Sequence, residues 1–441
     1  MRTPSLPSSL KALIIWIALL AALMYAAVSL TKRPPPPTIS AQSGHDGKPH
    51  ARLDALGYLN LLRREAGLDP FSRSDALTRS AAKHARYLND YPEDMHDENH
   101  ADSPLYTGKE LDERVEKTGY LYLGVQENLS TGAHAAPMGE QTLQHQYIDG
   151  LMTAIYHRFS LLDPVADEAG IAYSTHNNRH ALVINQGRRD AERLCRLNRS
   201  EEEVDESRSY YSGLCRNGAV FYQDELKLNI PDYTVYPVGK LAAPVFSNET
   251  PNPLPDREYS GNPVSIAFAE GGEEPQMISF ELFKGKEKIG NTRLLTAETD
   301  PNKRLSPYQF ALFPLAPLAY DTAYRAVFRY RLPDWENDGD IKEHTAEWSF
   351  RTRKPDYPYF NLKGGENLAV ESGRSYYLRW PAQACRPDCS RISFREYGGA
   401  EIATYTGEYD GLIVSVSGKR GSGVRVKPLY GNTGETALLV Q

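Results

Sequence analysis

Apolar residues recur at three-to-four spacing in several segments between residues 51 and 156, and this pattern predicts amphipathic helices. The helix expected after Ser74 has a clear start, because a serine hydroxyl can accept a hydrogen bond from the first helical turn. Glycine or proline ends several of these runs, as expected at helix termini. The predicted helices cover residues 51–68, 74–88, 112–118 and 139–156.

Beyond residue 165 the pattern changes to short runs in which apolar and polar residues alternate, which predicts strands. Residues 170–173 and 181–184 flank His176-Asn177-Asn178, a turn sequence that predicts a hairpin. Helices first and strands later favour an α+β chain over a doubly wound sheet. Further strands are expected at residues 278–282, 324–330, 348–350, 376–380, 412–416 and 424–426.

Residues 12–30 form an apolar run without charge, glycine or proline. About 20 such residues can cross the hydrocarbon core of a bilayer, so the run predicts an N-terminal transmembrane helix. A cleaved signal peptide is the alternative, although its apolar region is normally shorter. Both interpretations place the rest of the chain outside the cytoplasm, in the periplasm or at the cell surface.

Composition and turn-forming residues divide the rest of the chain into segments. Four prolines at residues 34–37 begin a polar, extended spacer, and proline- and glycine-rich turns appear from about residue 240. The expected order is a membrane anchor or signal segment, a Pro-rich linker, a helical and β domain, a disulfide-closed linker, an Ig-like β-sandwich and a small C-terminal β domain. Their predicted ranges are 1–31, 32–50, 51–195, 196–240, 241–354 and 355–441.

Charge and cysteine content narrow the functional classes. The net charge of -7 argues against nucleic-acid binding, which favours a basic surface. The four cysteines fall into two local pairs, Cys195 with Cys215 and Cys385 with Cys389. Two such pairs suit disulfides in an oxidising compartment, and four free thiols in the cytosol are the alternative.

Eight of the 11 histidines lie between residues 84 and 180, and several stand in recognisable motifs. Gln126-Glu127-Asn128 resembles a "GEN" motif with glutamine in place of glycine. Tyr156-His157-Arg158 resembles an "HR" segment, and Leu161-Leu162-Asp163-Pro164 follows it. With the segments at 59–70, 84–88, 96–120, 170–172 and 183–187, these motifs resemble the bacterial CAP (SCP-domain) superfamily over about 140 residues.

The resemblance implies an α-β-α sandwich with a cleft that two histidines and one or two glutamates line, and that holds a divalent cation in some members. Matched residue by residue, it indicates His96, Glu127 and His157 as metal ligands or catalytic groups, with His100 as the alternative to His96. Glu98 is a weaker candidate, and no residue clearly matches the family's second glutamate. Asp149 and Glu140 are nearby acids only.

Two imidazoles and a carboxylate leave positions open on Zn²⁺ for water or substrate. Without metal, the same groups can act as general acids and bases near neutral pH. The structural alternative is that they tie loops together by hydrogen bonds.

The favoured hypothesis is an extracytoplasmic binding or structural module of the cell envelope. Its expected partner is an envelope ligand, a lipid, a wall component or a protein, and residues 12–30 would contact the membrane. A metal-assisted or His/Glu-based hydrolase acting on peptide or envelope substrates is the alternative. A fold alone does not decide between them.

Overall fold

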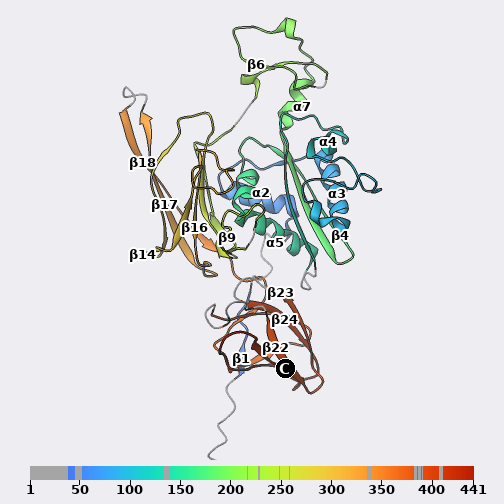
Figure 1. The fold of residues 1–441 in the computed structure, drawn as a ribbon, viewed down its shortest axis with the longest axis vertical. Coiled ribbons are helices and arrows are strands. Elements are labelled where there is room, and N and C mark those ends of the chain that lie inside the picture. The colour runs from blue at the N-terminus through green and yellow to red at the C-terminus, as the bar shows by residue number, and fades with distance from the viewer. Residues whose placement is uncertain are drawn as a thin grey trace, which may run out of the picture.

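The computed structural model describes three packed domains and a projecting arm (Figure 1). The arm lies at one end of the long axis and the C-terminal domain at the other. The structure describes residues 38–44, 52–133, 139–215, 217–226, 229–247, 249–257, 259–334, 340–381, 385, 389, 391–406 and 411–441.

The first domain has three layers, with a four-stranded sheet between helices. Strands pair in the order β2-β4-β5-β3. Alternate residues of β5 face opposite layers, because side chains alternate along a strand: Leu182 packs with α2 and α5, and Val183 packs with α3. The elements are α2 (Ala55–Glu65), β2 (Ser72–Arg73), α3 (Asp75–Asp90), η2 (Pro92–Asp94), α4 (Leu111–Glu116), β3 (Gln126–Ala133), α5 (Glu140–Thr153), α6 (Ile155–Leu161), β4 (Glu168–His176) and β5 (Arg179–Gly187).

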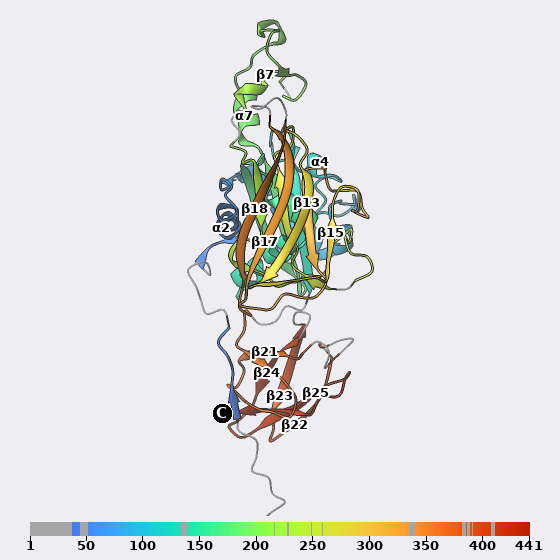
Figure 2. The same cartoon turned by 90° about the vertical axis from the view of Figure 1, so that its left-hand side faces the viewer.

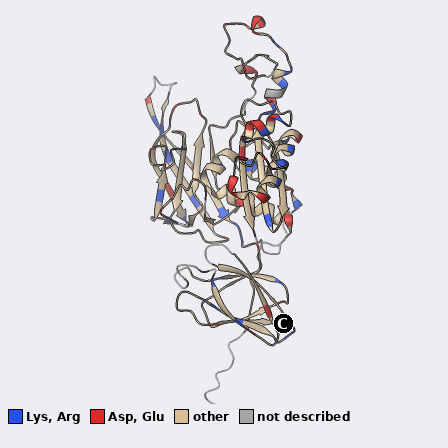
Figure 3. Cartoon of the chain, turned by 45° about the vertical axis from the view of Figure 1, so that its right-hand side comes forward, with Lys and Arg blue, Asp and Glu red and all other residues tan. Residues whose placement is uncertain are grey.

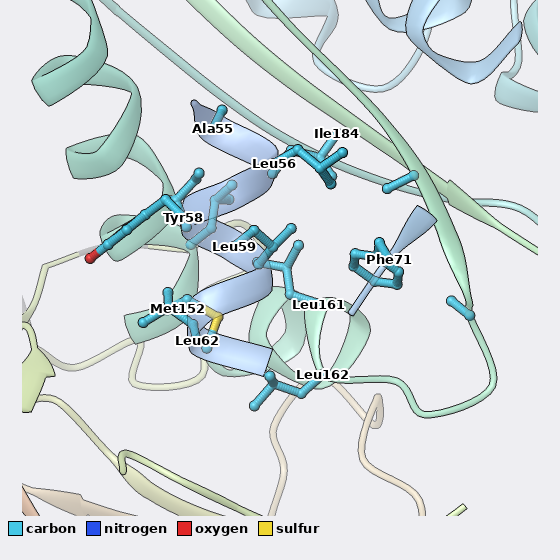
Figure 4. Packing of buried hydrophobic residues seen from close by; sticks show 14 of the residues in the cluster. Ala55, Leu56, Tyr58, Leu59, Leu62, Phe71, Met152, Leu161, Leu162 and Ile184 are labelled. Atoms are coloured by element: carbon cyan, nitrogen blue, oxygen red, sulfur yellow. The ribbon is translucent and has the colours of Figure 1, made fainter. Parts of the chain in front are cut away.

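Helix α2 supplies much of the core on one side of this sheet. Its apolar face carries Leu59 and Leu62, which are almost fully buried. Figure 4 shows these side chains beside Met152 of α5 and Leu161 of α6. Burying a leucine side chain contributes about 1.5–3 kcal/mol, so this packing fixes α5 and α6 against the sheet and thereby positions the motif that begins at Tyr156.

A disulfide-closed arm follows the first domain. Helix α7 (Arg189–Cys195) leads into it, and the disulfide between Cys195 and Cys215 closes it. The second predicted disulfide, between Cys385 and Cys389, also forms. The tip of the arm carries the acidic 3-10 helix η3 (Figure 3). The elements of the arm after α7 are η3 (Glu201–Glu203), β6 (Tyr210–Tyr211), β7 (Phe221–Tyr222) and η4 (Gln223–Glu225).

The second domain is a β-sandwich. Its sheets have the orders β15-β16-β12-β8 and β14-β13-β17-β18-β9, and Figure 2 shows β13, β17 and β18 side by side. Phe310 and Phe328, one from each sheet, meet in the core with ring centroids 5.0 Å apart. The strands are β8 (Tyr233–Tyr236), β9 (Gly239–Ala242), β10 (Val245–Phe246), β11 (Ser260–Gly261), β12 (Val264–Phe268), β13 (Gln276–Lys284), β14 (Glu287–Lys288), β15 (Thr292–Leu295), β16 (Gln309–Pro314), β17 (Ala323–Asp334) and β18 (Asp340–Thr352).

The C-terminal domain also has two sheets, β19-β21-β24-β23 and β1-β20-β26-β25-β22. Strand β1 comes from the segment expected to be a spacer, and it pairs in parallel with β20. Residues 38–40 are therefore part of the C-terminal domain. The strands are β1 (Thr38–Ser40), β19 (Tyr359–Asn361), β20 (Asn367–Val370), β21 (Ser375–Arg379), β22 (Ile392–Tyr397), β23 (Glu401–Thr406), β24 (Gly411–Ser417), β25 (Gly423–Pro428) and β26 (Thr436–Val440).

The predicted fold class, an α+β multidomain chain with an N-terminal transmembrane helix, is wrong. The described chain is mostly β, because strands dominate everything after α7. No helix among the described residues is long and apolar enough to cross a membrane. The longest, α3, has 16 residues and extends about 24 Å at 1.5 Å per residue, short of a bilayer core of about 30 Å. Residues 12–30 lie outside the described residues.

Candidate functional site

Two of the three predicted site residues meet in the first domain. His96 lies in the loop after η2, and its Nδ1 atom is 3.1 Å from Oε1 of Glu127 on β3. The side chain of His96 is 48% exposed, whereas that of Glu127 is 2% exposed. Because an ionised carboxylate can only accept, Nδ1 of His96 donates to it. The outer face of the imidazole remains accessible to solvent.

Arg114 of α4 neutralises the carboxylate of Glu127. Its Nη2 atom lies 2.9 Å from Oε1 and 3.1 Å from Oε2 of Glu127. Nη1 of the same guanidinium donates to the carbonyl of Lys109, and the Arg114 side chain has no exposed surface. A charge pair this deeply buried is strongly coupled, because little water screens it.

A second buried pair lies directly behind Glu127. His84 of α3 contacts Oε1 of Glu98 through Nδ1 at 3.0 Å and the carbonyl of Met95 through Nε2 at 2.8 Å. Both partners accept hydrogen bonds when Glu98 is ionised, so a His84 ring with two N–H donors can satisfy each of them. Nε2 of His84 also lies 3.7 Å from Oε1 of Glu127. With His84 in this form, two cations and two carboxylates balance each other.

Both carboxylates are held ionised by these neighbours. Burial alone would raise the pKa of Glu127, but the hydrogen bond from His96 and the charges of His84 and Arg114 bring it below its ordinary value. Burial likewise opposes ionisation of Glu98, and hydrogen bonds from His84 and the backbone of Thr107 lower its pKa. The cluster is thus a set of fixed, mutually neutralised charges.

Arg114 would compete with a divalent cation for the carboxylate of Glu127. A metal needs carboxylate lone pairs, and Arg114 contacts both oxygens of Glu127. A cation placed there would also be repelled by the guanidinium. Within the described ranges, no group of three or more His, Cys, Asp or Glu side chains is arranged to hold a metal ion. His100, the alternative ligand, stacks on Tyr91 and lies 4.0 Å from Asp94.

His157, the third predicted site residue, has a different partner. It lies on α6, and its Nδ1 atom is 2.8 Å from Oε1 of Glu249, which belongs to the second domain. The same oxygen accepts the backbone N–H groups of Tyr156 and His157, so Glu249 caps the first turn of α6. Oε2 of Glu249 is buried and has no hydrogen-bond partner among the described residues. His157 is therefore part of the contact between the first and second domains.

Arg158, the next residue, anchors the interface. It has no exposed surface, and burial lowers its pKa to about 10. The guanidinium donates to the carbonyls of Met152 and Pro263 at 2.7 Å, to Oγ of Ser265 at 3.0 Å and to Oδ1 of Asn262 at 2.5 Å. Three of these four acceptors belong to the second domain, so Arg158 joins the two domains.

A cavity of about 550 Å³ lies beside this interface. One wall is formed by α6 and the segment after it, including Ser160 and Asp163, and the other by β8, β12 and β16. Its size is within the range of about 300–1,000 Å³ that is usual for small-molecule sites. The lining combines aromatic rings with amide, hydroxyl and charged groups: Gln126, Tyr156, Phe159, Ser160, Asp163, Tyr236, Phe268, Glu270, Arg304 and Gln309.

Sequence reasoning missed two residues that shape this region. The sequence placed Arg114 in a family motif but gave it no role. Its pairing with Glu127 depends on how α4 folds back onto β3. Glu249 lies 92 positions after His157, outside the segment with the CAP motifs, and no sequence pattern marks it. Glu98, a weak candidate from sequence, is a member of the buried cluster.

Comparison with known proteins identifies the first domain. The CAP family model, described as the cysteine-rich secretory protein family, matches residues 56–186. This domain is therefore a CAP-superfamily domain, as the motifs predicted. No curated protein matches the chain.

Similar solved structures include an outer surface protein from Borrelia burgdorferi. It is 19% identical over 33% of this chain and 98% of that chain, with a TM-score of 0.26. An extracellular protein containing a SCP domain from Bacillus anthracis is 20% identical over 31% of this chain, with a TM-score of 0.24. The match spans 39% of the length of the Bacillus protein.

Proposed function

We propose that the chain is an extracytoplasmic binding module in which the CAP domain and the β-sandwich hold an envelope ligand between them. The observation that carries this proposal is the cavity of about 550 Å³ beside the Arg158 anchor. Ligand sites are commonly found at domain interfaces. The two disulfides support an oxidising compartment such as the periplasm or the cell surface.

The buried charge cluster has a structural role in this proposal. His84, Glu98, Arg114 and Glu127 join α3, α4, β3 and the loop between α3 and α4. Their charges are already balanced, so they stabilise the loop around His96 without a bound cation. Isothermal titration of the wild type with ZnCl₂ tests this role, and we expect no heat of binding. Binding that is lost in His96→Ala would instead support a metal site.

The cavity is tested by filling it. Ala267 of β12 lines the cavity, so Ala267→Trp should block it, whereas Ala101→Trp places the same ring on an exposed loop. Both proteins and the wild type are incubated with lipid, sugar and peptide fractions of a cell-envelope extract and analysed by native mass spectrometry. We expect a bound mass in the wild type and in Ala101→Trp but not in Ala267→Trp. A bound mass retained in Ala267→Trp would contradict this location.

One observation favours a hydrolase as the second candidate. The exposed imidazole of His96 is oriented by the buried carboxylate of Glu127, an arrangement that can serve a general base. A hydrolase of this kind would release fragments from envelope peptides, and His96→Ala would abolish the release. Equal release by the wild type and His96→Ala would exclude it.

A further inference from the structure

A second cavity, of about 590 Å³, lies where all three domains meet. It is separate from the cavity beside Arg158, since the described residues that line the two cavities are all different. Each domain contributes tyrosine to its wall. These tyrosines are Tyr147 of α5, Tyr259 and Tyr320 of the second domain, and Tyr357 and Tyr377 of the C-terminal domain.

The tyrosine rings pack into one cluster, in which Tyr357 and Tyr377 are buried and Tyr320 is partly buried. Tyr320 and Tyr377 meet edge to face, with ring centroids 6.4 Å apart. Tyr359 and Tyr405 extend the same cluster beyond the cavity wall. Such rings combine an apolar face with a polar hydroxyl, so the cluster suits a ligand that has both apolar faces and hydrogen-bonding groups.

The charges in the wall neutralise one another. Arg353 lies 2.9 Å from Asp356 and 3.3 Å from Asp149. Gln146 donates to Asp356 at 2.7 Å, and Tyr58 donates to Asp149 at 2.6 Å. Burial also raises the pKa of Asp149 to about 7, which reduces its negative charge further. An added cation would meet Arg353 and an added anion would meet Asp356, so the wall favours an uncharged ligand.

The wall also contains a hydroxyl without a hydrogen bond. Tyr357 is 8% exposed, and within the part of the chain that the structure describes its Oη atom has no partner. Buried hydroxyls are usually paired, since leaving one unpaired costs about 1–3 kcal/mol. Because this oxygen is buried, a hydroxyl-rich ligand in the cavity would supply the missing partner only when the Tyr357 side chain turns toward the cavity on binding.

We propose that this tyrosine-lined cavity binds a neutral carbohydrate chain. The C–H faces of sugar rings pack on aromatic rings, and sugar hydroxyls exchange hydrogen bonds with phenols, amides and carboxylates. The cavity offers all of these groups, and the charged side chains that the structure describes in its wall are paired. The site is independent of the cavity proposed above, so either can be tested without the other.

The test uses two neutral oligosaccharides, maltotetraose and a tetramer of N-acetylglucosamine, with choline as a cationic probe. Binding to the chain is measured by calorimetry. We expect at least one of the two oligosaccharides to bind and choline not to bind. Choline binding without oligosaccharide binding, or no binding of any probe, would overturn the proposal.

Substitutions then locate the site. Tyr357→Phe removes only the unpaired hydroxyl, so it should raise the melting temperature or leave it unchanged, and it should weaken oligosaccharide binding about 5- to 10-fold. Tyr320→Ala removes a ring and should weaken binding about 10-fold or more. Tyr430→Phe is the control, because Tyr430 is exposed and lies outside the cavity. Affinity unchanged in both cavity variants would overturn the assignment even if the wild type binds sugar.

Discussion

The two histidines predicted to share one site lie in different surroundings. His96 stands at the surface of the CAP domain and is held by Glu127 of the same domain. His157 is 16% exposed and pairs with Glu249 of the β-sandwich. Both residues belong to the sequence motifs of one family, yet His157 lies in the interface with the second domain. A motif therefore identifies the domain to which a residue belongs more reliably than it identifies the chemistry of that residue.

The difference extends to the neighbouring charges. Around His96, carboxylates and cations are balanced within the CAP domain. Around His157, balance requires both domains, because Glu249 and three acceptors of Arg158 come from the sandwich. Substitutions near His96 should thus affect one domain, and substitutions near His157 should affect the joint between two.

The largest effect is expected at this joint. Arg158→Ala leaves four buried acceptors without their donor, so we expect a loss of about 3–5 kcal/mol in the free energy of unfolding. Urea unfolding measures it, with Arg325→Ala as the control. Arg325 forms an exposed pair with Glu347, so its loss should cost less than about 1 kcal/mol. Equal losses in both variants would mean that Arg158 does not join the domains.

Within the CAP domain, Glu127→Gln is expected to cost about 3 kcal/mol. The amide keeps the shape of the side chain but leaves the cations of Arg114 and His84 with one buried carboxylate, Glu98. Urea unfolding again measures the effect. An unchanged free energy of unfolding would indicate that the cluster does not support the fold and would reopen a functional role for Glu127.

The two histidines can be compared directly. His157→Ala removes a donor from the buried carboxylate of Glu249, whose other oxygen has no partner among the described residues, so we expect a loss of about 1–3 kcal/mol. His96→Ala breaks a contact at a half-exposed ring and should cost about 0–1 kcal/mol. Thermal unfolding of both variants checks this order, and the reverse order would refute the contrast.

The smallest effect is a pH dependence. The pKa values of Glu98 and Glu127 lie below the ordinary 4.5 in the folded state, so the unfolded chain binds protons first as pH falls. Their contribution to stability is complete above about pH 4.5 and is lost as pH falls through the folded-state values. Melting temperatures between pH 6 and pH 3 should decline less steeply in Glu127→Gln than in the wild type. Parallel declines would contradict this.

Local patterns predicted local structure well. The hydroxyl of Ser74 accepts from Leu77 at the start of α3, and Asn177 and Asn178 form a two-residue turn with positive φ between β4 and β5. Both depend on neighbouring residues alone, because capping and turn formation act over a few positions. The match of the CAP family to residues 56–186 likewise confirms the family predicted from motifs.

Contacts between distant segments could not be predicted in this way. Glu249 reaches His157 across a domain boundary, and β1 joins a sheet more than 300 positions later in the chain. Neither a single carboxylate nor a three-residue strand carries a distinctive pattern. The metal and catalytic roles of His96, Glu127 and His157 stay predictions, since they came from the family resemblance rather than from packing.

The pairing of β1 with β20 also determines how mechanical force would pass through the chain. A pull applied ahead of Thr38 loads the three residue pairs between Thr38–Ser40 and Asn367–Ala369 before it reaches the CAP domain. The tension therefore enters the C-terminal domain first, and it passes along the chain toward the CAP domain only once β1 and the bridge between Gln42 and Tyr359 have separated. The C-terminal domain thus acts as a mechanical buffer for the CAP domain and the β-sandwich, which hold the cavity beside Arg158.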